Sequence, residues 1–347
     1  MIVIRADANS KIGMGHVMRC TAIAERLREK GEQVCFLVAD ENPVPLLQGK
    51  GIPCHVLHTD YSHMEEETGK LTALLDTLKP SAILIDSYYV TPEYLREVRR
   101  RTRTIYLDDI FAFSYPVDLL INYNIYAKEM GYGKLAGSQD ACGQPARFCL
   151  GTSYVPLRQE FSGVPYTVKD RAEQILISTG GSDSYNLAGQ FLEEALRQEE
   201  TKNKIYHVIC GSLNPHRDSL QALAAAHGNI RIHSNVTNMA ELMRQCDVAI
   251  SAGGSTMYEL CAVGVPTITF SFAANQERIV ESFLRLQYAA GGGNYLVDKE
   301  KLAPAVIRIL GQLCGDREKR MAYSSKARTL VDGRGAERIA DAILAYF

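Results

Sequence analysis

Residues 248–263 read Val-Ala-Ile-Ser-Ala-Gly-Gly-Ser-Thr-Met-Tyr-Glu-Leu-Cys-Ala-Val, and they contain one complete copy of the unit that decides the fold. The apolar start, 248–250, is typical of a strand buried in a parallel sheet. The end, 256–263, predicts a helix. Gly253 and Gly254 form the turn between them, because glycine tolerates the backbone angles and close contacts of a sharp turn. The stretch therefore predicts a strand–turn–helix unit of an α/β protein.

Working outward, strands and helices alternate in two separate runs along the chain. The first run begins with a strand at 2–4 and the second with a strand at 174–178. Two such runs predict two doubly wound parallel-sheet domains with a cleft between them, and sheets of this kind bind ligands beyond the carboxyl ends of their strands. Three strands of the first run end in polar residues, which places polar groups at that edge: Asp86, Asp108 and Asn122.

The domain boundaries follow from the same pattern. Residues 1–157 form the first predicted domain and residues 170–332 the second, with a Pro- and Gly-containing linker at 154–168. Residues 333–347 form a C-terminal helical segment. The length agrees with two domains, because 347 residues exceed the roughly 100–200 that one domain usually holds.

Composition excludes several classes of protein. The chain is 46% hydrophobic and 22% charged, unlike a disordered chain. Its 38 basic and 40 acidic residues give a net charge of -2, which is no footprint of a nucleic-acid binder. No stretch approaches the roughly 18 apolar residues of a membrane span, and the first residues do not resemble a signal peptide. We expect a cytoplasmic protein with no nucleic-acid or membrane partner; the oligomeric state is not readable from the sequence.

The cysteines and histidines do not predict a metal centre. The nine cysteines are scattered and include no C-x-x-C pair, so we expect reduced thiols in the core. The eight histidines show no H-x-x-x-H or H-E-x-x-H spacing. We therefore expect neither a metal nor another cofactor.

Three glycine-rich turns each follow a predicted strand and open a predicted helix. A turn that opens a helix favours an anion such as a diphosphate, because free N–H groups and the positive end of the helix dipole lie there. The alternative is that these are ordinary tight turns, and none matches the dinucleotide or P-loop patterns. The candidate contacts with substrate in these turns are Gly13, Gly15, Gly180, Gly181, Ser182, Gly253, Gly254 and Ser255.

His16 follows the first turn and is the candidate catalytic residue. Imidazole titrates near neutrality, which suits general acid–base chemistry, while the alternative is a structural histidine at a helix start. Asp7 lies nearby and is a candidate for orienting His16 or for binding the polar groups of a substrate. Tyr88 follows the strand that ends in Asp86 and is a weaker candidate for the same contact.

Glu259 is a candidate ribose ligand. A capping box would place the acid three residues after Ser255, at Tyr258, so capping explains Glu259 poorly. A carboxylate one turn into the helix can accept hydrogen bonds from two vicinal hydroxyls; the alternative is an ordinary surface glutamate. Asn275 and Gln276 open a later helix and either cap it or contact a sugar or a phosphate.

Several of these stretches resemble the UDP-sugar hydrolases of the pseudaminic acid pathway. The similar stretches are Arg5 to Asp7, Ile12 to Arg19, Ile177 to Asp183, Ser251 to Glu259, and the pair Asn275-Gln276. The Glu259 stretch is shared with the wider GT-B superfamily, which includes the lipid II glycosyltransferase. The combination of the N-terminal stretch with the Glu259 stretch is the more specific signal.

This resemblance implies a GT-B fold, with two Rossmann-like domains and the site between them. It implies hydrolysis of UDP-2,4-diacetamido-2,4,6-trideoxy-β-L-altropyranose to UDP and the free sugar, without a metal and by attack at the anomeric carbon. His16 would activate the water, Glu259 would hold the ribose, and the two later glycine turns would hold the diphosphate. Asn275 and Gln276 would lie near the phosphate and sugar. The C-terminal segment 333–347 would pack back on the first domain.

Three other functions compete with hydrolysis. A GT-B glycosyltransferase would pass the sugar from a UDP-sugar donor to an acceptor other than water, and the fold and nucleotide motifs do not separate the two. A UDP-sugar 2-epimerase would use the same scaffold. A nucleotide-sugar-binding module would lack catalysis, and the presence of His16 argues against it.

Overall fold

Seven parallel strands form the first sheet of the computed structural model, which describes residues 1–9, 11–134, 147–211 and 214–346. The strand order is β3-β2-β1-β4-β5-β6-β7. The alternation of strands and helices along the sequence suits parallel pairing, because parallel neighbours need a crossover between them. The strands are β1 (Ile2–Ala6), β2 (Val34–Val38), β3 (Cys54–Val56), β4 (Ala82–Asp86), β5 (Arg103–Leu107), β6 (Leu119–Asn122) and β7 (Arg147–Leu150).

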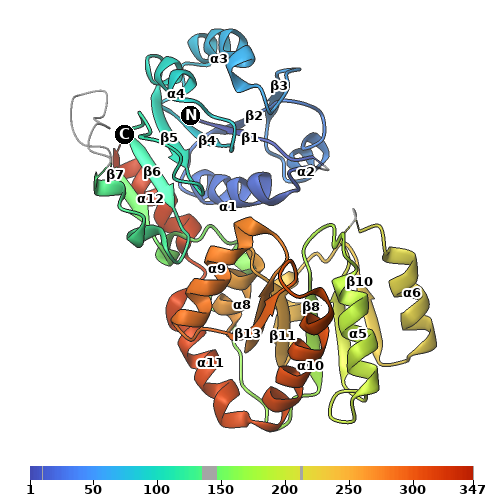
Figure 1. The fold of residues 1–347 in the computed structure, drawn as a ribbon. Coiled ribbons are helices and arrows are strands. Elements are labelled where there is room, and N and C mark those ends of the chain that lie inside the picture. Colours follow the sequence, from blue (N-terminus) through green and yellow to red (C-terminus); the bar gives the residue numbers. More distant parts are fainter. Residues whose placement is uncertain (10, 135–146, 212–213, 347) are drawn as a thin grey trace. The chain divides into compact units, whose positions relative to one another are not determined.

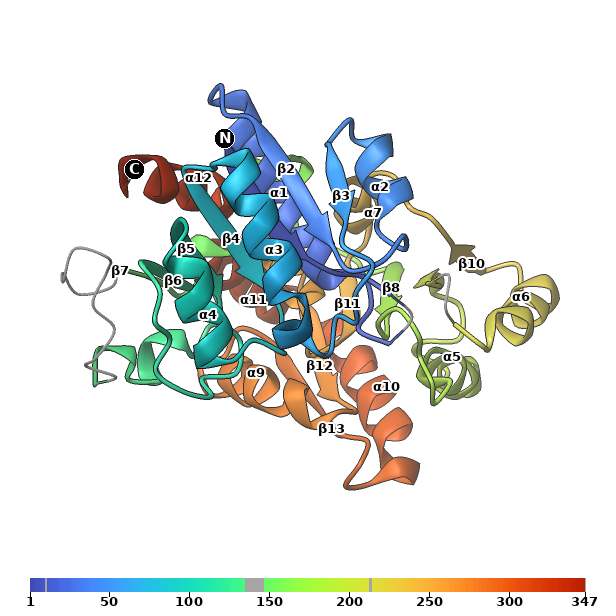
Figure 2. The ribbon, with the colours of Figure 1, turned by 90° about the horizontal axis from the view of Figure 1, so that it is seen from above.

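Helices cover both faces of this sheet. In Figures 1 and 2, α3 and α4 lie on one face and α1 on the other. The helices of this unit are α1 (Gly15–Glu29), α2 (Val44–Gly49), α3 (Met64–Leu78), α4 (Pro92–Arg99) and α12 (Gly335–Tyr346), with short 3-10 turns η1 (Ala127–Glu129), η2 (Tyr132–Lys134) and η3 (Thr152–Tyr154).

Six parallel strands form the second sheet, in the order β10-β9-β8-β11-β12-β13. The strands are β8 (Gln174–Ser178), β9 (Ile205–Ile209), β10 (Ile230–His233), β11 (Val248–Ala252), β12 (Thr267–Ser271) and β13 (Ala290–Asn294). The helices are α5 (Leu187–Arg197), α6 (Arg217–Ala226), α7 (Met239–Gln245), α8 (Thr256–Val263), α9 (Ala274–Arg285), α10 (Lys299–Gly315) and α11 (Arg317–Leu330), preceded by η4 (Gln159–Phe161). Within this unit α5 packs on α10, and α8 packs on α11.

The chain divides into two compact units. The first unit comprises Met1–Arg158 and Arg334–Phe347, and the second comprises Gln159–Gly333. The C-terminal helix α12 packs on α1 within the first unit. Lys30 on α1 forms an ion pair with Asp341, at 2.7 Å, and Arg338 donates a hydrogen bond to the carbonyl oxygen of Ser153, at 3.0 Å.

Three elements differ from the sequence expectation. The strand β13 reads Ala-Gly-Gly-Gly-Asn, which carries none of the β-branched residues that indicate a strand. Its glycines are explained by packing: a Cβ on Gly292 would lie 2.6 Å from Cγ2 of Val306 in α10. The helix α2 was not predicted, and the expected linker at 154–168 contains the 3-10 turn η4.

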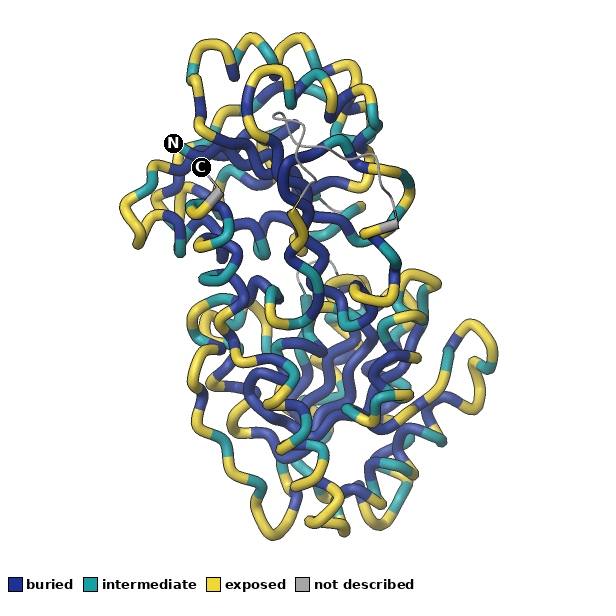
Figure 3. The backbone as a smooth tube through the Cα atoms, turned by 90° about the vertical axis from the view of Figure 1, so that its left-hand side faces the viewer, coloured by how far each residue is buried: buried dark blue, intermediate teal, exposed yellow. Residues whose placement is uncertain are grey.

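The central strands of each sheet are buried, and Figure 3 shows the backbone tube in dark blue through the interior of each unit. Residues 83–85 of β4 are fully buried. The first unit also buries a charge network, in which Arg5 on β1 donates two hydrogen bonds of 2.8 Å to the carboxylate of Glu67 on α3. Tyr94 donates a third to the same carboxylate, at 2.8 Å. A buried arginine of this kind is stable only because its partners satisfy it.

In the second unit, two stacked histidines lie on neighbouring strands. Nδ1 of His207 on β9 lies 2.9 Å from Nε2 of His233 on β10, and Nε2 of His207 lies 2.6 Å from the side-chain oxygen of Gln174 on β8. The amide oxygen of Gln174 can only accept a hydrogen bond, so we assign the proton of His207 to Nε2. The unprotonated Nδ1 of His207 then accepts a hydrogen bond from the protonated Nε2 of His233. Burial, with His233 and the charge of Arg231 adding to it, lowers the pKa of His207 to about 4.

We predict that this pair makes the protein less stable in acid. Above the unfolded pKa of about 6.5, His207 is neutral in both the folded and the unfolded state, so it does not change the free energy of unfolding. Between about pH 6.5 and about pH 4 the unfolded chain binds a proton that the folded chain refuses, so the free energy of unfolding falls, by up to about 3 kcal/mol. Urea unfolding at several pH values measures this fall. The variant His207→Gln should lose this part of the pH dependence, and identical slopes for the two proteins would contradict the assignment.

Candidate active site

The strand order places the ends of β1 and β4 together. The order of the first sheet reverses between these two strands, and ligands bind at such a point in doubly wound sheets. The register pairs Ala6, the last residue of β1, with Asp86, the last residue of β4. The loop after β1 leads into α1, so the first turn of α1 and Asp86 share one edge of the sheet.

His16 lies in the first turn of α1 and faces Asp86. Asn9 shapes the loop before it by accepting hydrogen bonds from the N–H groups of Lys11 and Ile12, and Gly13 has a φ of 74° that favours glycine. The imidazole of His16 is 6% exposed, and its Nδ1 lies 2.7 Å from Oδ1 of Asp86. The ring of Tyr88 stands edge-on against the imidazole, with ring centres 4.7 Å apart.

The protonation of this pair follows from the carboxylate. Burial by itself would raise the pKa of Asp86, but the charges of Arg19 and His16 and their hydrogen bonds outweigh burial and lower it far below its ordinary value. An ionised carboxylate only accepts hydrogen bonds, so we assign the imidazole proton to Nδ1. Among the described residues, none forms a hydrogen bond with Nε2. The lone pair of Nε2 is therefore available to take a proton, as a general base requires.

Arg19 lies one turn after His16 and joins two carboxylates. It forms hydrogen bonds with both oxygens of Asp86, from Nε at 2.6 Å and from Nη2 at 2.5 Å. Its Nη1 donates to Oδ2 of Asp109 at 2.7 Å and to the hydroxyl of Tyr123 at 2.6 Å. The side chain of Arg19 is only 13% exposed, so these pairs are shielded from water.

Tyr88 extends this network to the surface. Its hydroxyl donates to Oδ2 of Asp109 at 3.3 Å, and Asn124 donates to Oδ1 of the same carboxylate at 3.0 Å. Burial and the charge of Asp109 raise the pKa of Tyr88, so its hydroxyl keeps its proton. Tyr88 is nevertheless 41% exposed, and it therefore lies next to His16 with one side open to solvent.

Asp7 lies elsewhere. Its Oδ2 accepts a hydrogen bond from Arg5 at 2.5 Å and its Oδ1 accepts one from the N–H of Ala39 at 2.7 Å. Asp7 is 5% exposed. It belongs to the buried network of Arg5 and Glu67, because Arg5 donates hydrogen bonds to both carboxylates. The residue that orients His16 is Asp86, not Asp7.

The second sheet has an equivalent reversal, between β8 and β11. The turn at Gly253 and Gly254 follows β11, and α8 begins two residues later. Ser255 occupies the N-cap position with helical angles, and its side chain makes no capping hydrogen bond with this helix. Glu259 lies in the first turn of α8 and is half-buried. The start of α8 thus has the form that favours an anion.

The turn at Gly180 and Gly181 does not open a helix, contrary to the sequence expectation. Five residues, 182–186, separate it from the start of α5 at Leu187. The carboxylate of Asp183 accepts hydrogen bonds from the N–H groups of Leu187 and Ala188, at 2.8 and 3.1 Å. The carboxylate of Asp183 therefore already occupies the N-terminal start of α5, where an anionic ligand would otherwise bind. Gly180, Gly181 and Ser182 are exposed beyond the end of β8.

Packing explains part of the glycine pattern at α8. A Cβ on Gly253 would lie 2.5 Å from Cγ2 of Val280 and 3.0 Å from the carbonyl oxygen of Gln276, both in α9, whereas a Cβ on Gly254 would meet no atom within 4 Å. The side-chain oxygen of Gln276 accepts a hydrogen bond from the N–H of Phe272, at 3.0 Å, and so caps the turn before α9. Asn275 and Ser255 are exposed.

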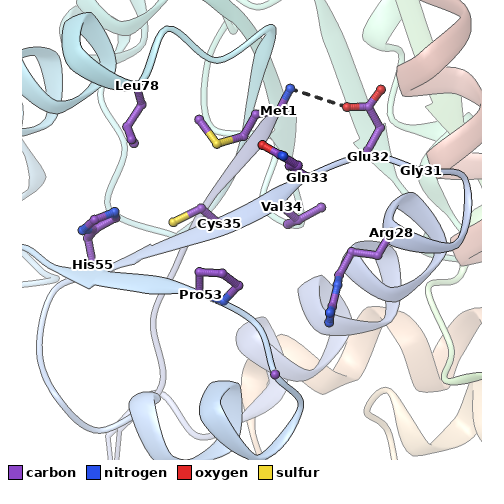
Figure 4. A pocket seen from close by; sticks show the side chains of 11 residues that line it. Met1, Arg28, Gly31, Glu32, Gln33, Val34, Cys35, Pro53, His55 and Leu78 are labelled. Atoms are coloured by element: carbon purple, nitrogen blue, oxygen red, sulfur yellow. Dashed lines mark ion pairs between the residues drawn. The ribbon is translucent and has the colours of Figure 1, made fainter.

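A pocket of about 550 Å³ lies at the opposite edge of the first sheet. Figure 4 shows Cys35 and His55 on its wall, with an ion pair between the amino group of Met1 and Glu32. These residues precede or begin the strands, whereas His16 follows one. Burial raises the pKa of Cys35 to about 11, which makes its thiol a poor nucleophile. The pocket is therefore separate from the candidate site.

In the described part of the chain, no group of three or more His, Cys, Asp and Glu side chains is arranged to hold a metal ion. No described helix has both the length and the apolar character that crossing a membrane requires.

Comparison with known proteins agrees with this architecture. Residues 175–332 match the Glycosyltransferase family 28 C-terminal domain. The crystal structure of MurG from Acinetobacter baumannii is similar with a TM-score of 0.70 and 16% identity, over 99% of both chains. The two parallel sheets and this likeness define a GT-B fold, which the sequence predicted.

Three of the curated relatives illustrate this similarity, each with 26% identity over the matched residues. An uncharacterized protein of Methanocaldococcus jannaschii matches over 82% of the chain, which spans 58% of that relative. The spore coat polysaccharide biosynthesis protein SpsG of Bacillus subtilis matches over 97% of the chain and 95% of its own length. The UDP-2,4-diacetamido-2,4,6-trideoxy-beta-L-altropyranose hydrolase of Campylobacter jejuni matches over 80% of the chain and 93% of its own length.

The partners of His16 were missed in the sequence. Arg19 is three residues from His16, a spacing that places both on one side of a helix, and this signal was present. Asp86 and Asp109 each follow a predicted strand, but the order of those strands was needed to bring them to His16. The sequence stretch 5–7 drew attention to Asp7 instead, because Asp7 is closer to His16 along the chain.

We predict that the two glycines before α8 differ in their effect on stability. The variant Gly253→Ala should lower the free energy of unfolding by about 1–3 kcal/mol, because its methyl group collides with α9. The variant Gly254→Ala has open space and should stay within about 0.5 kcal/mol of the parent chain. Urea unfolding measures both. Equal effects of the two substitutions would show that the contact between this turn and α9 is wrongly described.

Proposed function

We propose that the chain hydrolyses a UDP-sugar, with His16 as the general base. The observation that carries this proposal is the pair His16–Asp86, which leaves Nε2 of a nearly buried imidazole without a partner among the described residues. The particular substrate that we propose is UDP-2,4-diacetamido-2,4,6-trideoxy-β-L-altropyranose, and the relative from C. jejuni that bears the name of this hydrolase supports that choice.

The reaction would be a single displacement by water. Nε2 of His16 takes a proton from water while the water oxygen forms a bond to the anomeric carbon. The bond between that carbon and the diphosphate oxygen breaks, and UDP leaves with the electron pair. The imidazolium is stabilised by the carboxylate of Asp86 until its proton passes to solvent. The products are UDP and the free sugar with inverted configuration.

The second unit would hold the UDP. The start of α8, where Ser255 makes no capping hydrogen bond, would bind the diphosphate through the backbone N–H groups of Gly253, Gly254 and Ser255. Glu259, half-buried in the first turn of α8, would accept hydrogen bonds from the ribose hydroxyls. The other residues proposed to contact the substrate are Gly13, Gly15, Tyr88, Gly180, Gly181, Ser182, Asn275 and Gln276. We propose that no metal takes part, because a helix start can stabilise the leaving diphosphate.

A glycosyltransferase that uses a UDP-sugar donor is the alternative. The family 28 domain match supports it. A set of exposed apolar side chains also supports it, because these side chains lie on the loops around His16, after β1, β4 and β5, and would suit an apolar acceptor. They are Met14, Tyr88, Tyr89 and Ile110.

Turnover without an acceptor separates the two reactions. The protein is mixed with the altrose-configured UDP-sugar or with UDP-N-acetylglucosamine in ¹⁸O-labelled water, with and without a chelator, and proton NMR and mass spectrometry follow the products. We expect release of UDP and free sugar from the first substrate only, unaffected by the chelator, with the label in the sugar. A label in UDP would contradict attack at carbon, and binding of UDP without any turnover would favour the transferase.

We predict that the variant His16→Asn loses about 10²- to 10⁴-fold in turnover and keeps its affinity for UDP, because only the proton transfer is removed. Calorimetry measures the affinity. The matched control is His55→Asn, which changes an exposed histidine at the opposite edge of the same sheet. If His16→Asn kept more than about a tenth of the turnover, or lost UDP binding together with turnover, His16 would not be the base.

A further inference from the structure

We propose that Arg19 is a positioning residue that sets both the geometry and the charge around His16. The proposal rests on the proposed function, in which His16 is the base. Arg19 belongs to a closed ring of five side chains, and each member contacts the next. The ring runs from Arg19 to Asp86, His16, Tyr88 and Asp109 and back to Arg19.

The first half of the ring fixes the imidazole. The guanidinium binds Asp86 with two parallel hydrogen bonds, of 2.6 and 2.5 Å, and such a fork holds a carboxylate in one plane. It also keeps Asp86 ionised, so that Asp86 accepts a hydrogen bond from the protonated Nδ1 of His16. The guanidinium nitrogen Nη2 lies only 3.2 Å from Nδ1 but cannot donate to it while Nδ1 carries that proton. Arg19 thus acts on His16 through Asp86.

The second half of the ring fixes the tyrosine. Nη1 of Arg19 binds Oδ2 of Asp109 at 2.7 Å, and the same oxygen accepts the hydroxyl of Tyr88 at 3.3 Å. The ring of Tyr88 then stands against the imidazole at an interplanar angle of 78°. Tyr88 is exposed and would otherwise be free to rotate away, so its orientation depends on the carboxylate that Arg19 holds.

The ring also sets the local charge. Asp86 and Asp109 carry two negative charges and Arg19 carries one positive charge, so the sum is -1 while His16 is neutral and 0 when His16 holds a second proton. Titratable groups among the described residues that also interact with these charges are Tyr88, Tyr106, Tyr123 and Cys20, and burial raises the pKa of each, so they stay neutral. Without Arg19 two uncompensated carboxylates would face His16 and hold its second proton more tightly.

Titration of His16 by NMR tests this charge without any substrate. Long-range proton–nitrogen spectra of the full chain report the tautomer and the titration midpoint, with His16→Asn used for assignment. In Arg19→Met the midpoint should move up by about one pH unit, and in Asp109→Asn it should move down by a similar amount. The double variant Arg19→Met/Asp109→Asn restores the sum of -1 and should return to within about 0.3 units of the parent chain.

Kinetics of the same variants test the positioning. The acidic limb of the kcat/KM profile should follow the midpoints of the NMR titration. The double variant should nevertheless turn over at least about tenfold more slowly than the parent chain, because Asp86 then lacks the guanidinium fork and Tyr88 lacks the carboxylate that accepts its hydroxyl. The single variant Arg19→Lys keeps the positive charge but not the two parallel hydrogen bonds to Asp86. It should therefore turn over faster than Arg19→Met and more slowly than the parent chain. The control is Arg28→Met, an exposed arginine near the other end of α1.

The outcomes separate the inference from the proposed function. Coinciding midpoints in all variants, or full turnover in the double variant, would overturn the role of Arg19 even when His16→Asn is inactive. Active His16→Asn would overturn the proposed function, while the NMR titrations would still report on Arg19. If Arg19→Met fails to fold because two buried carboxylates lose their partner, Asp109→Asn and the double variant still decide the charge argument.

Discussion

The ionised carboxylate of Asp86 is the group on which the candidate site depends. A carboxylate with 1% exposure is stable only when charged or hydrogen-bonding partners replace the water it has lost, and Asp86 has His16, Arg19 and the thiol of Cys20 around it. All three partners come from α1, so the same contacts that stabilise the carboxylate also fix the rotation of this helix against β4. The orientation of the imidazole is then a consequence of burying a charge at the end of a strand. Removing the carboxylate would leave both the helix and the imidazole without their common partner.

The two units use the reversal of strand order in different ways. In the first unit, the reversal brings acidic side chains from two strand ends to a helix that carries the histidine and the arginine. In the second unit, it brings two glycine turns together, and only one of them leads directly into a helix. The chain supplies its own anion, Asp183, to the start of α5, whereas Ser255, the N-cap residue of α8, makes no capping hydrogen bond. The two helix starts therefore differ in whether a preceding side chain occupies their free N–H groups.

The sequence predicted the fold well where the chain carries strong periodicity. The apolar strand 82–85 and the helix after Gly13 lie close to where the pattern placed them. The strand Ala290–Asn294 was missed because its residues have low strand propensity. Its glycines are required instead by the close packing of side chains from α9 and α10. Site residues divide in the same way: His16 stood out by its position after a glycine turn, whereas Asp86 and Asp109 were two strand ends among several. Asp7 was the wrong neighbour for His16, because Arg5 and Ala39, both distant from the site chemistry, take its two oxygens.

By itself the sequence determined that this chain folds into two parallel α/β sheets, with polar residues at the carboxyl ends of strands and glycine turns before helices. Those features depend on residues close together along the chain, through hydrogen bonding and local burial. The tertiary structure alone decided which strand ends are neighbours, and therefore that Asp86 meets His16 while Asp109 reaches it through Arg19 and Tyr88. It also decided which glycines are needed for packing and which leave open space. These contacts join residues far apart in sequence, and only the order of the strands and the packing of the helices brings them within hydrogen-bond distance.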